Sequence, residues 1–134
     1  MSLILIRKAL EERLALITPA ISTAYENVSF TPVNNVPYQR VNLLTAAPAN
    51  PTLGGSHYRE EGIFQVTLCY PENQAVATIN ARVALVRNQF VRGLSLTTGG
   101  VSLTIARTPA VLTAFIDEAR YCLAISIEWF SSLN

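Results

Sequence analysis

The chain has 134 residues and a net charge of +1, and only 14% of its residues are charged, against about 25% in an average domain. This length predicts a single domain, residues 1–134, with a core that needs neither a metal nor a disulfide. No cluster of Lys and Arg and no run of about 18 apolar residues is present, which argues against duplex nucleic acid as a partner and against a membrane span. So few charges favour a homo-oligomer, whose interfaces cover neutral and apolar surface; a mildly apolar monomer is the alternative.

Residues 2–17 have the spacing of an amphipathic helix. Its apolar stripe consists of side chains three or four residues apart: Leu3, Ile6, Leu10, Leu14 and Ile17. The charged residues follow the apolar start of the chain rather than precede it, which argues against a signal peptide. We expect this helix to cover a sheet and to end before Pro19; an interaction helix is the alternative.

Two strands are predicted next, separated by a turn-rich connection. Alternation at residues 21–25 indicates a short strand, and Asn34, Asn35 and Pro37 mark the connection. Residues 38–44 form the second strand. Because both of its faces have mixed polarity, we expect one face to be exposed or to contact a neighbouring subunit.

Residues 45–58 contain no periodic apolar pattern and are predicted to form a flexible loop. Its notable members are Pro48, Pro51, Leu53, Gly54, Gly55, His57 and Tyr58. Loops longer than about 12 residues in a compact domain tend to be functional or disordered. We interpret this loop as a possible assembly loop that orders when subunits associate; a tolerated insertion is an equal alternative.

A strand followed by a helix is predicted for residues 60–90. The core side of the strand carries alternate residues: Phe64, Val66, Leu68 and Tyr70. Pro71 is expected to end the strand, Asn73 to cap the helix, and Gly93 to follow its end. The apolar stripe of the helix is Val76, Ile79, Val83, Val86 and Phe90.

The last part of the sequence predicts a hairpin, an irregular segment and a closing strand. Apolar alternation around Gly99 and Gly100 indicates a hairpin over residues 94–105. Residues 107–117 are irregular, but four of their side chains are expected to be buried: Val111, Leu112, Phe115 and Ile116. Residues 119–130 form the clearest strand. Its large face is Tyr121, Leu123, Ile125, Ile127 and Trp129, and its small face is Cys122, Ala124, Ser126 and Glu128.

The sequence contains no recognisable active site, metal site or cofactor site. Cys69 and Cys122 both lie in predicted strands and are possible neighbours, but without an export signal we expect two buried thiols. With His57 as the single histidine, these residues are too few for zinc, and neither cysteine has the surroundings of a nucleophile.

Two adjacent acidic pairs and two glycine pairs are the other candidates for chemistry. The acidic pairs lie at the starts of predicted strands and are Glu60 with Glu61 and Asp117 with Glu118. We favour the interpretation that they are solvated strand ends over the alternative that they meet across two strands as a carboxylate dyad. The Gly-Gly pairs lack the Lys-Ser/Thr of a phosphate-binding loop. We therefore expect no enzyme.

Four runs, together with the N-terminal helix, resemble a known family. They are residues 25–32 (Tyr-Glu-Asn-Val-Ser-Phe-Thr-Pro), 37–40 (Pro-Tyr-Gln-Arg), 62–66 (Gly-Ile-Phe-Gln-Val) and the closing strand, 121–129. In order and spacing they resemble the small tail-terminator-like proteins of long-tailed bacteriophages, from residue 2 to residue 130. No single run is specific, and the order carries the resemblance.

The resemblance implies an α+β fold, with an N-terminal helix and a second central helix packed on a mostly antiparallel sheet. It also implies a non-enzymatic ring, typically of six subunits, that caps the tail tube, ends its polymerisation and helps to join the head. The partners would then be the tail tube protein and a head-connector protein, in a virion tail assembled in the bacterial host cytoplasm. The alternatives are another neck or connector subunit, or a small cytosolic α+β enzyme or ligand-binding domain whose pocket forms between subunits.

Overall fold

Two long antiparallel strands, β3 (Tyr58–Pro71) and β8 (Arg120–Leu133), form the centre of the fold. The computed structural model describes residues 2–46 and 58–133, and residues 1, 47–57 and 134 lie outside the described part. β3 and β8 pair along their whole length, from Tyr58 opposite Leu133 to Pro71 opposite Arg120. Tyr58, which we assigned to the loop, therefore begins a strand, and Pro71 is the last residue of that strand.

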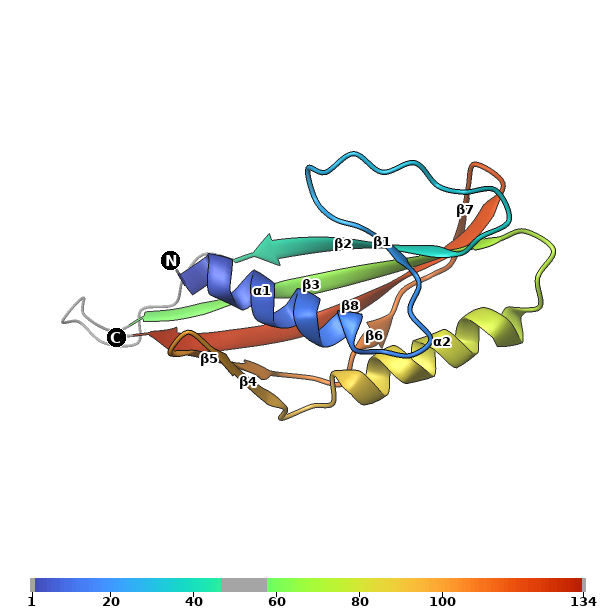
Figure 1. The fold of residues 1–134 in the computed structure, drawn as a ribbon. Helices are drawn as coiled ribbons and strands as arrows, with labels where there is room; N and C mark the ends of the chain where they lie inside the picture. The colour runs from blue at the N-terminus through green and yellow to red at the C-terminus, as the bar shows by residue number, and fades with distance from the viewer. Residues whose placement is uncertain (1, 47–57, 134) are drawn as a thin grey trace.

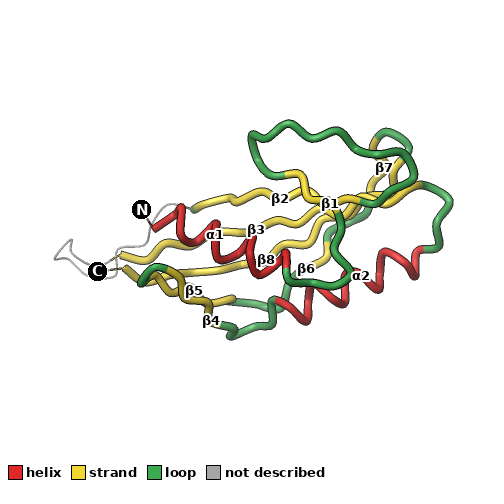
Figure 2. Tube along the Cα trace, in the orientation of Figure 1, coloured by secondary structure: helices red, strands yellow, loops and turns green. Residues whose placement is uncertain are grey.

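The remaining strands extend this pair in both directions (Figures 1 and 2). They are β1 (Ser22–Ala24), β2 (Tyr38–Thr45), β4 (Ser95–Thr98), β5 (Val101–Ile105), β6 (Ala110–Val111) and β7 (Phe115–Asp117). The main order is β1-β2-β3-β8-β5-β4, and β6 and β7 pair with the rest of β8. Only β1 and β2 run parallel, so the predicted α+β fold with a mostly antiparallel sheet is confirmed.

Helices α1 (Ser2–Ala15) and α2 (Val76–Gln89) cover the same face of this sheet (Figure 1). The predicted core residues of the central strands are buried there: Phe64, Val66, Leu68, Tyr70, Leu123, Ile125, Ile127 and Trp129. The stripe of α1 packs against them, as predicted. Neither of the described helices is long and apolar enough to cross a membrane.

The two ends of α2 differ from the prediction. The predicted cap Asn73 is wrong: α2 begins at Val76, so its N-cap residue is Ala75, which makes no side-chain hydrogen bond, and Asn73 lies in the preceding turn with φ 71°. Val76 is 52% exposed, whereas the other four stripe residues are buried. In Figure 1 the start of α2 projects past the end of α1, so α1 does not cover it. Gly93 (φ 87°) lies beyond the cap residue Phe90, and its N–H donates to Ile105 O, 2.8 Å away.

The predicted hairpin is confirmed, whereas the predicted burial of side chains in residues 107–117 is wrong. β4 and β5 form the hairpin, and Gly99 (φ 55°) and Gly100 (φ 83°) supply the two left-handed residues of its turn. Residues 107–117 contain β6 and β7, which line the edge of β8. The expected burial of their apolar side chains is wrong: Val111, Leu112, Phe115 and Ile116 are all exposed. Among the described residues, no further strand pairs outside β6 and β7 to cover them.

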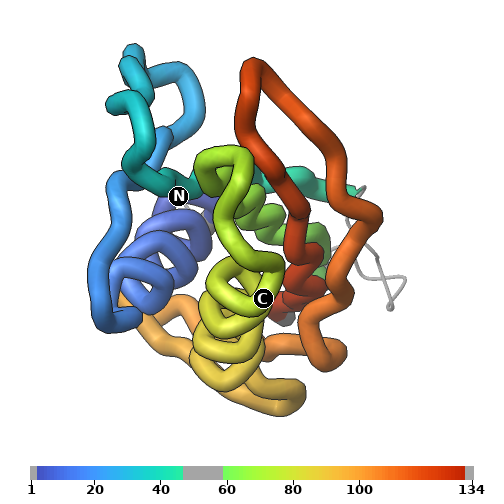
Figure 3. Tube along the Cα trace, turned by 90° about the vertical axis from the view of Figure 1, so that its right-hand side faces the viewer, coloured from blue at the N-terminus to red at the C-terminus, as the bar shows by residue number. Residues whose placement is uncertain are grey.

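The face of the sheet opposite the helices is covered at one end only. There residues 25–37 fold over it, and Phe30 packs against a small second core of Ala24, Tyr38, Cys69 and Cys122. Figure 3 shows that residues 25–37 and the β7–β8 turn both rise from this end of the molecule, away from α2. In the middle of the same face, half-exposed Asn42, Gln65 and Ser126 form a small, uncharged surface.

Candidate assembly surfaces

The predicted assembly loop lies almost entirely outside the described residues. This holds for Pro48, Pro51, Leu53, Gly54, Gly55 and His57, while Tyr58 is the first residue of β3. The two ends of the loop are held together, because the Ala46 N–H donates to Glu61 O at 2.9 Å. The assembly role of residues 45–58 therefore stays a prediction.

The candidate groups for chemistry are not brought together. Glu60 lies opposite Ser131 near one end of β8, and Asp117 lies opposite Arg120 at the other end, so the two acidic pairs form no dyad. Cys69 and Cys122 are not free thiols, and His57 lies outside the described part. Among the described residues, no three His, Cys, Asp or Glu side chains are grouped to hold a metal ion.

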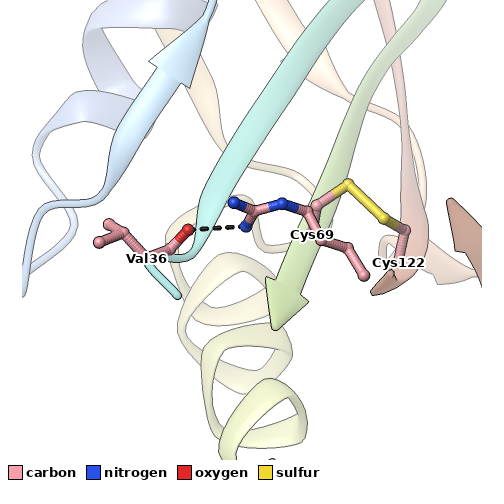
Figure 4. The surroundings of a disulfide bond; sticks show 4 residues. Val36, Cys69 and Cys122 are labelled. Carbon is pink, nitrogen blue, oxygen red and sulfur yellow. Dashed lines mark hydrogen bonds between the residues drawn. A yellow bond between two sulfur atoms is a disulfide. The ribbon is translucent and has the colours of Figure 1, made fainter. Parts of the chain in front are cut away.

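Cys69 and Cys122 form a disulfide (Figure 4), so the expectation of two buried thiols is wrong. They lie directly opposite each other on β3 and β8, with their Cα atoms 4.2 Å apart. Each cysteine is on the strand that the sequence predicted. Their pairing depends on the register between strands that are separated by 53 residues, and alternation within each strand does not fix this register.

Arg120 holds residues 25–37 over the disulfide. Its guanidinium donates to Val36 O at 2.7 Å and to Val33 O at 2.6 Å, and it lies 5.1 Å from the centre of the Tyr38 ring. The carbonyl of Val36 accepts its hydrogen bond beside the two cysteines (Figure 4). This end of the sheet face is therefore covered by residues 25–37 of the same subunit.

A groove of about 440 Å³ opens at the other end of the same face. Its lining includes apolar Leu44 and Ile63 and two ion pairs. Arg59 lies 3.5 Å from Glu61, and the charges of Arg107 and Glu128 lie 3.0 Å apart. Since each positive charge has its own carboxylate, the groove suits a neutral polypeptide surface better than a charged ligand. Its described lining contains no His or Cys for acid-base or nucleophilic chemistry.

Glu26 connects α1 to the open edge of β2. One carboxylate oxygen accepts both the backbone N–H of Leu43 and a hydrogen bond from Arg7 at 2.9 Å, and Arg7 also lies 3.6 Å from Glu11. Burial raises the pKa of Glu26, but these two hydrogen bonds outweigh burial and leave the pKa below its ordinary value. For Glu11, burial dominates and raises the pKa. The Glu26 contact blocks one N–H that β2 would otherwise offer to another strand.

A second cavity, of about 230 Å³, lies where the end of α1 meets β1, β2 and α2. Arg82 of α2 lines it and is only 4% exposed. Its Nη1 donates to Pro19 O, but its Nε has no hydrogen-bond partner in the described part of the chain, and neither does Oε1 of buried Gln39. Burial lowers the pKa of Arg82 and raises the pKa of Tyr70, whose neutral ring lies near the guanidinium.

Arg82 was not among the predicted site residues. Its position was a usable signal, because it follows Ile79 by three residues and precedes Val83 on the buried side of α2. A charged residue within an apolar helical stripe is either paired in the core or placed for a partner.

Comparison with known proteins identifies a family whose model matches this chain and solved structures with a similar fold. A family model described as "Phage tail terminator protein" matches residues 5–129. Eight chains of solved structures also match. One of them superposes with a TM-score of 0.80 at 27% sequence identity, and the match covers 98% of this chain and 96% of the other. Comparison with curated proteins finds no match.

Proposed function

Because this chain belongs to the phage tail terminator family, we propose that it assembles as a ring on the end of the tail tube. The ring stops further polymerisation of the tube and offers a surface for joining the head. The proposal rests on the family match, which covers nearly the whole chain and supports a role in phage tail assembly. The family is structural, and we propose that this chain likewise catalyses no reaction.

Three features of the described residues support an assembly role. The middle of one sheet face is uncharged and bears no helix, the groove beside it is internally neutral, and the edge at β6 and β7 exposes four large apolar side chains. Exposed apolar surface of this kind is typical of protein–protein contacts. We propose six copies in the ring, with the tail tube protein on one side and a head-connector protein on the other, in the virion tail after assembly in the host cytoplasm.

The test combines the mass of the purified protein in solution with its effect on growing tubes. We expect sedimentation to give a multiple of 14.6 kDa, and negative-stain images to show rings or capped tube ends. Added to polymerising tube protein, the chain should shorten the tubes. A compact dimer with a deep closed pocket, and tubes of unchanged length, would favour a ligand-binding or enzymatic domain. Rings that bind the connector but not tube ends would indicate another neck subunit.

A further inference from the structure

Arg82 carries a positive charge into the protein interior without a compensating carboxylate. All nine side-chain carboxylates of the sequence belong to described residues, and none forms an ion pair with Arg82. Within residues 2–46 and 58–133, the guanidinium donates one hydrogen bond, to the carbonyl of Pro19, and its Nε–H has no partner. A buried charge without an opposite charge is costly. The described part of the chain therefore leaves this site electrostatically incomplete.

The cavity beside Arg82 has room for the missing group. Its volume of about 230 Å³ is far larger than the roughly 30 Å³ occupied by one water molecule. Arg82 and Gln39 both line it and are more than nine-tenths buried, although Arg82 Nε and Gln39 Oε1 themselves are closed off from solvent. Tyr25 adds apolar ring surface to the cavity lining. A matching ligand has a carboxylate and apolar flanks.

The turn between β7 and β8 has both properties. Asp117 and Glu118 are exposed and form no ion pair in the described part of the chain. Phe115 and Ile116, immediately before them, are 46% and 62% exposed. Glu118 and Ala119, with φ of 47° and 62°, are the two central residues of this hairpin turn, which places the Glu118 side chain at its tip. Glu72, the other exposed acid without an ion pair, is followed by polar Asn73 and Gln74 instead.

We propose that the β7–β8 turn of one copy docks at the Arg82 cavity of a second copy, where the Glu118 carboxylate compensates the charge of the Arg82 guanidinium. Phe115 and Ile116 cover apolar surface around Tyr25. The inference rests on the proposed function and specifies the contact between neighbouring copies.

The positions of the two surfaces make this contact head-to-tail. The turn belongs to one edge of the sheet, and the cavity adjoins β1 at the other edge, with β2, β3 and β8 between them. A contact between two different surfaces leaves one of each free in a pair of copies, so further copies can add until the rotation between copies closes a ring. A ring of identical subunits requires a contact of this head-to-tail kind.

The decisive experiment uses two single variants and their mixture. Glu118→Gln removes the carboxylate, and Arg82→Met removes the guanidinium in favour of an apolar side chain of similar length. By sedimentation, each variant alone should self-associate at least about tenfold more weakly than the wild type. Their equimolar mixture should form heterodimers of twice 14.6 kDa, because one intact turn meets one intact cavity and growth stops there. Glu72→Gln is the matched control and should assemble normally.

A cross-linking measurement keeps the proposal testable if Arg82→Met fails to fold. A photoreactive phenylalanine analogue at Tyr25 should cross-link to a peptide containing residues 112–120 of another copy, whereas the analogue at exposed Val91 should not. If Glu118→Gln assembles normally, or if the mixture stays monomeric, the proposed contact is wrong. In either case, rings formed by the wild type would still support the proposed function. A wild-type chain that forms no rings and leaves tube length unchanged overturns the proposed function itself.

Discussion

At the scale of single residues, Gly62 occupies a position in β3 where neighbouring backbone leaves no room for a side chain. A Cβ built at this position lies 2.2 Å from Leu44 O and 3.0 Å from the Trp129 ring. Because backbone of a paired strand moves only with its neighbours, Gly62→Ala should lower the free energy of unfolding by about 1–3 kcal/mol. Urea denaturation measures this change.

The matched control for Gly62 is Gln65→Ala, three residues along the same strand. Gln65 is half-exposed on the face without helices, so its truncation should change the free energy of unfolding by less than about 0.5 kcal/mol. Equal stabilities of Gly62→Ala and the wild type would show that β2 and Trp129 do not approach Gly62 this closely.

Glu26 and Glu11 should make opposite contributions to the pH dependence of stability. The folded pKa of Glu26 is below its ordinary 4.5, so its charged form stabilises the fold above that pH, and the contribution is lost as pH falls through the folded pKa. Glu26→Gln should therefore lower stability at pH 7, by less than about 1 kcal/mol because the side chain is partly exposed. The difference from the wild type should shrink as the pH falls through the folded pKa.

Glu11→Gln supplies the control with the opposite sign. The folded pKa of Glu11 is raised, so its protonated form is favoured in the fold, and the stability gained from protonation is lost as pH rises through the folded pKa. Glu11→Gln should leave stability at pH 7 unchanged or slightly higher. Urea midpoints between pH 3 and pH 7 test both variants, and a loss of stability in Glu11→Gln as large as that in Glu26→Gln would contradict these assignments.

At the scale of elements, Phe90 fixes the end of α2 to the sheet. It is fully buried, and its ring centre lies 6.2 Å from that of Phe64. Phe90→Ala should lower the free energy of unfolding by about 3–5 kcal/mol, because it removes a large side chain and leaves a cavity. The adjacent Val91 is exposed, and Val91→Ala should have little effect. Similar costs for the two variants in thermal denaturation would mean that α2 is rotated from the position described.

The disulfide should add stability to the central strand pair without being required for folding. It closes a loop that spans 53 residues, for which the chain-entropy estimate is about 4 kcal/mol, an upper value because β3 and β8 also pair by hydrogen bonds. The main core lies on the other face of the sheet, so the reduced protein should still unfold cooperatively. Thermal denaturation with and without reductant measures the difference.

A variant with both Cys69 and Cys122 changed to Ala is the control for this experiment, and its melting temperature should not respond to reductant. An equal melting temperature of the wild type in the two conditions would show that the thiols are not joined. Complete unfolding on reduction would show that the core alone is insufficient.

The spacing of apolar residues within single elements correctly predicted the long strands and the two helices. In β3, β8 and the helical stripes, burial is set by the alternation of faces along the element, which the local sequence records. Three features depend instead on partners distant in sequence. The disulfide depends on the register of β3 against β8, and the exposure of Phe115 depends on what lies beyond a sheet edge. The burial of Arg82 depends on the segment after α1, whose Pro19 carbonyl accepts its hydrogen bond. Local patterns do not contain this information.

At the scale of the whole molecule, the loop of residues 45–58 gives a prediction about assembly. Its composition, with Pro48, Pro51, Gly54 and Gly55, offers little apolar surface to offset an ordering cost of about 1–2 kcal/mol per residue. Replacing residues 47–57 by a short Gly/Ser linker should leave the melting temperature of the subunit nearly unchanged but impair ring formation or tube capping. A shortened variant that assembles and caps tubes normally would contradict an assembly role for the loop.

The place of β8 in the sheet has a consequence for how the chain folds during synthesis. β3, β5, β6 and β7 all pair with β8, and β8 follows every one of them along the chain. Until it leaves the ribosome, these strands lack their shared partner, and the apolar side chains of β3 and α2 have no complete surface to cover them. Folding therefore starts late and over long sequence separations, which slows it and lengthens the exposure of aggregation-prone strands. Production of this subunit should consequently depend on chaperones and on temperature more than its small size suggests.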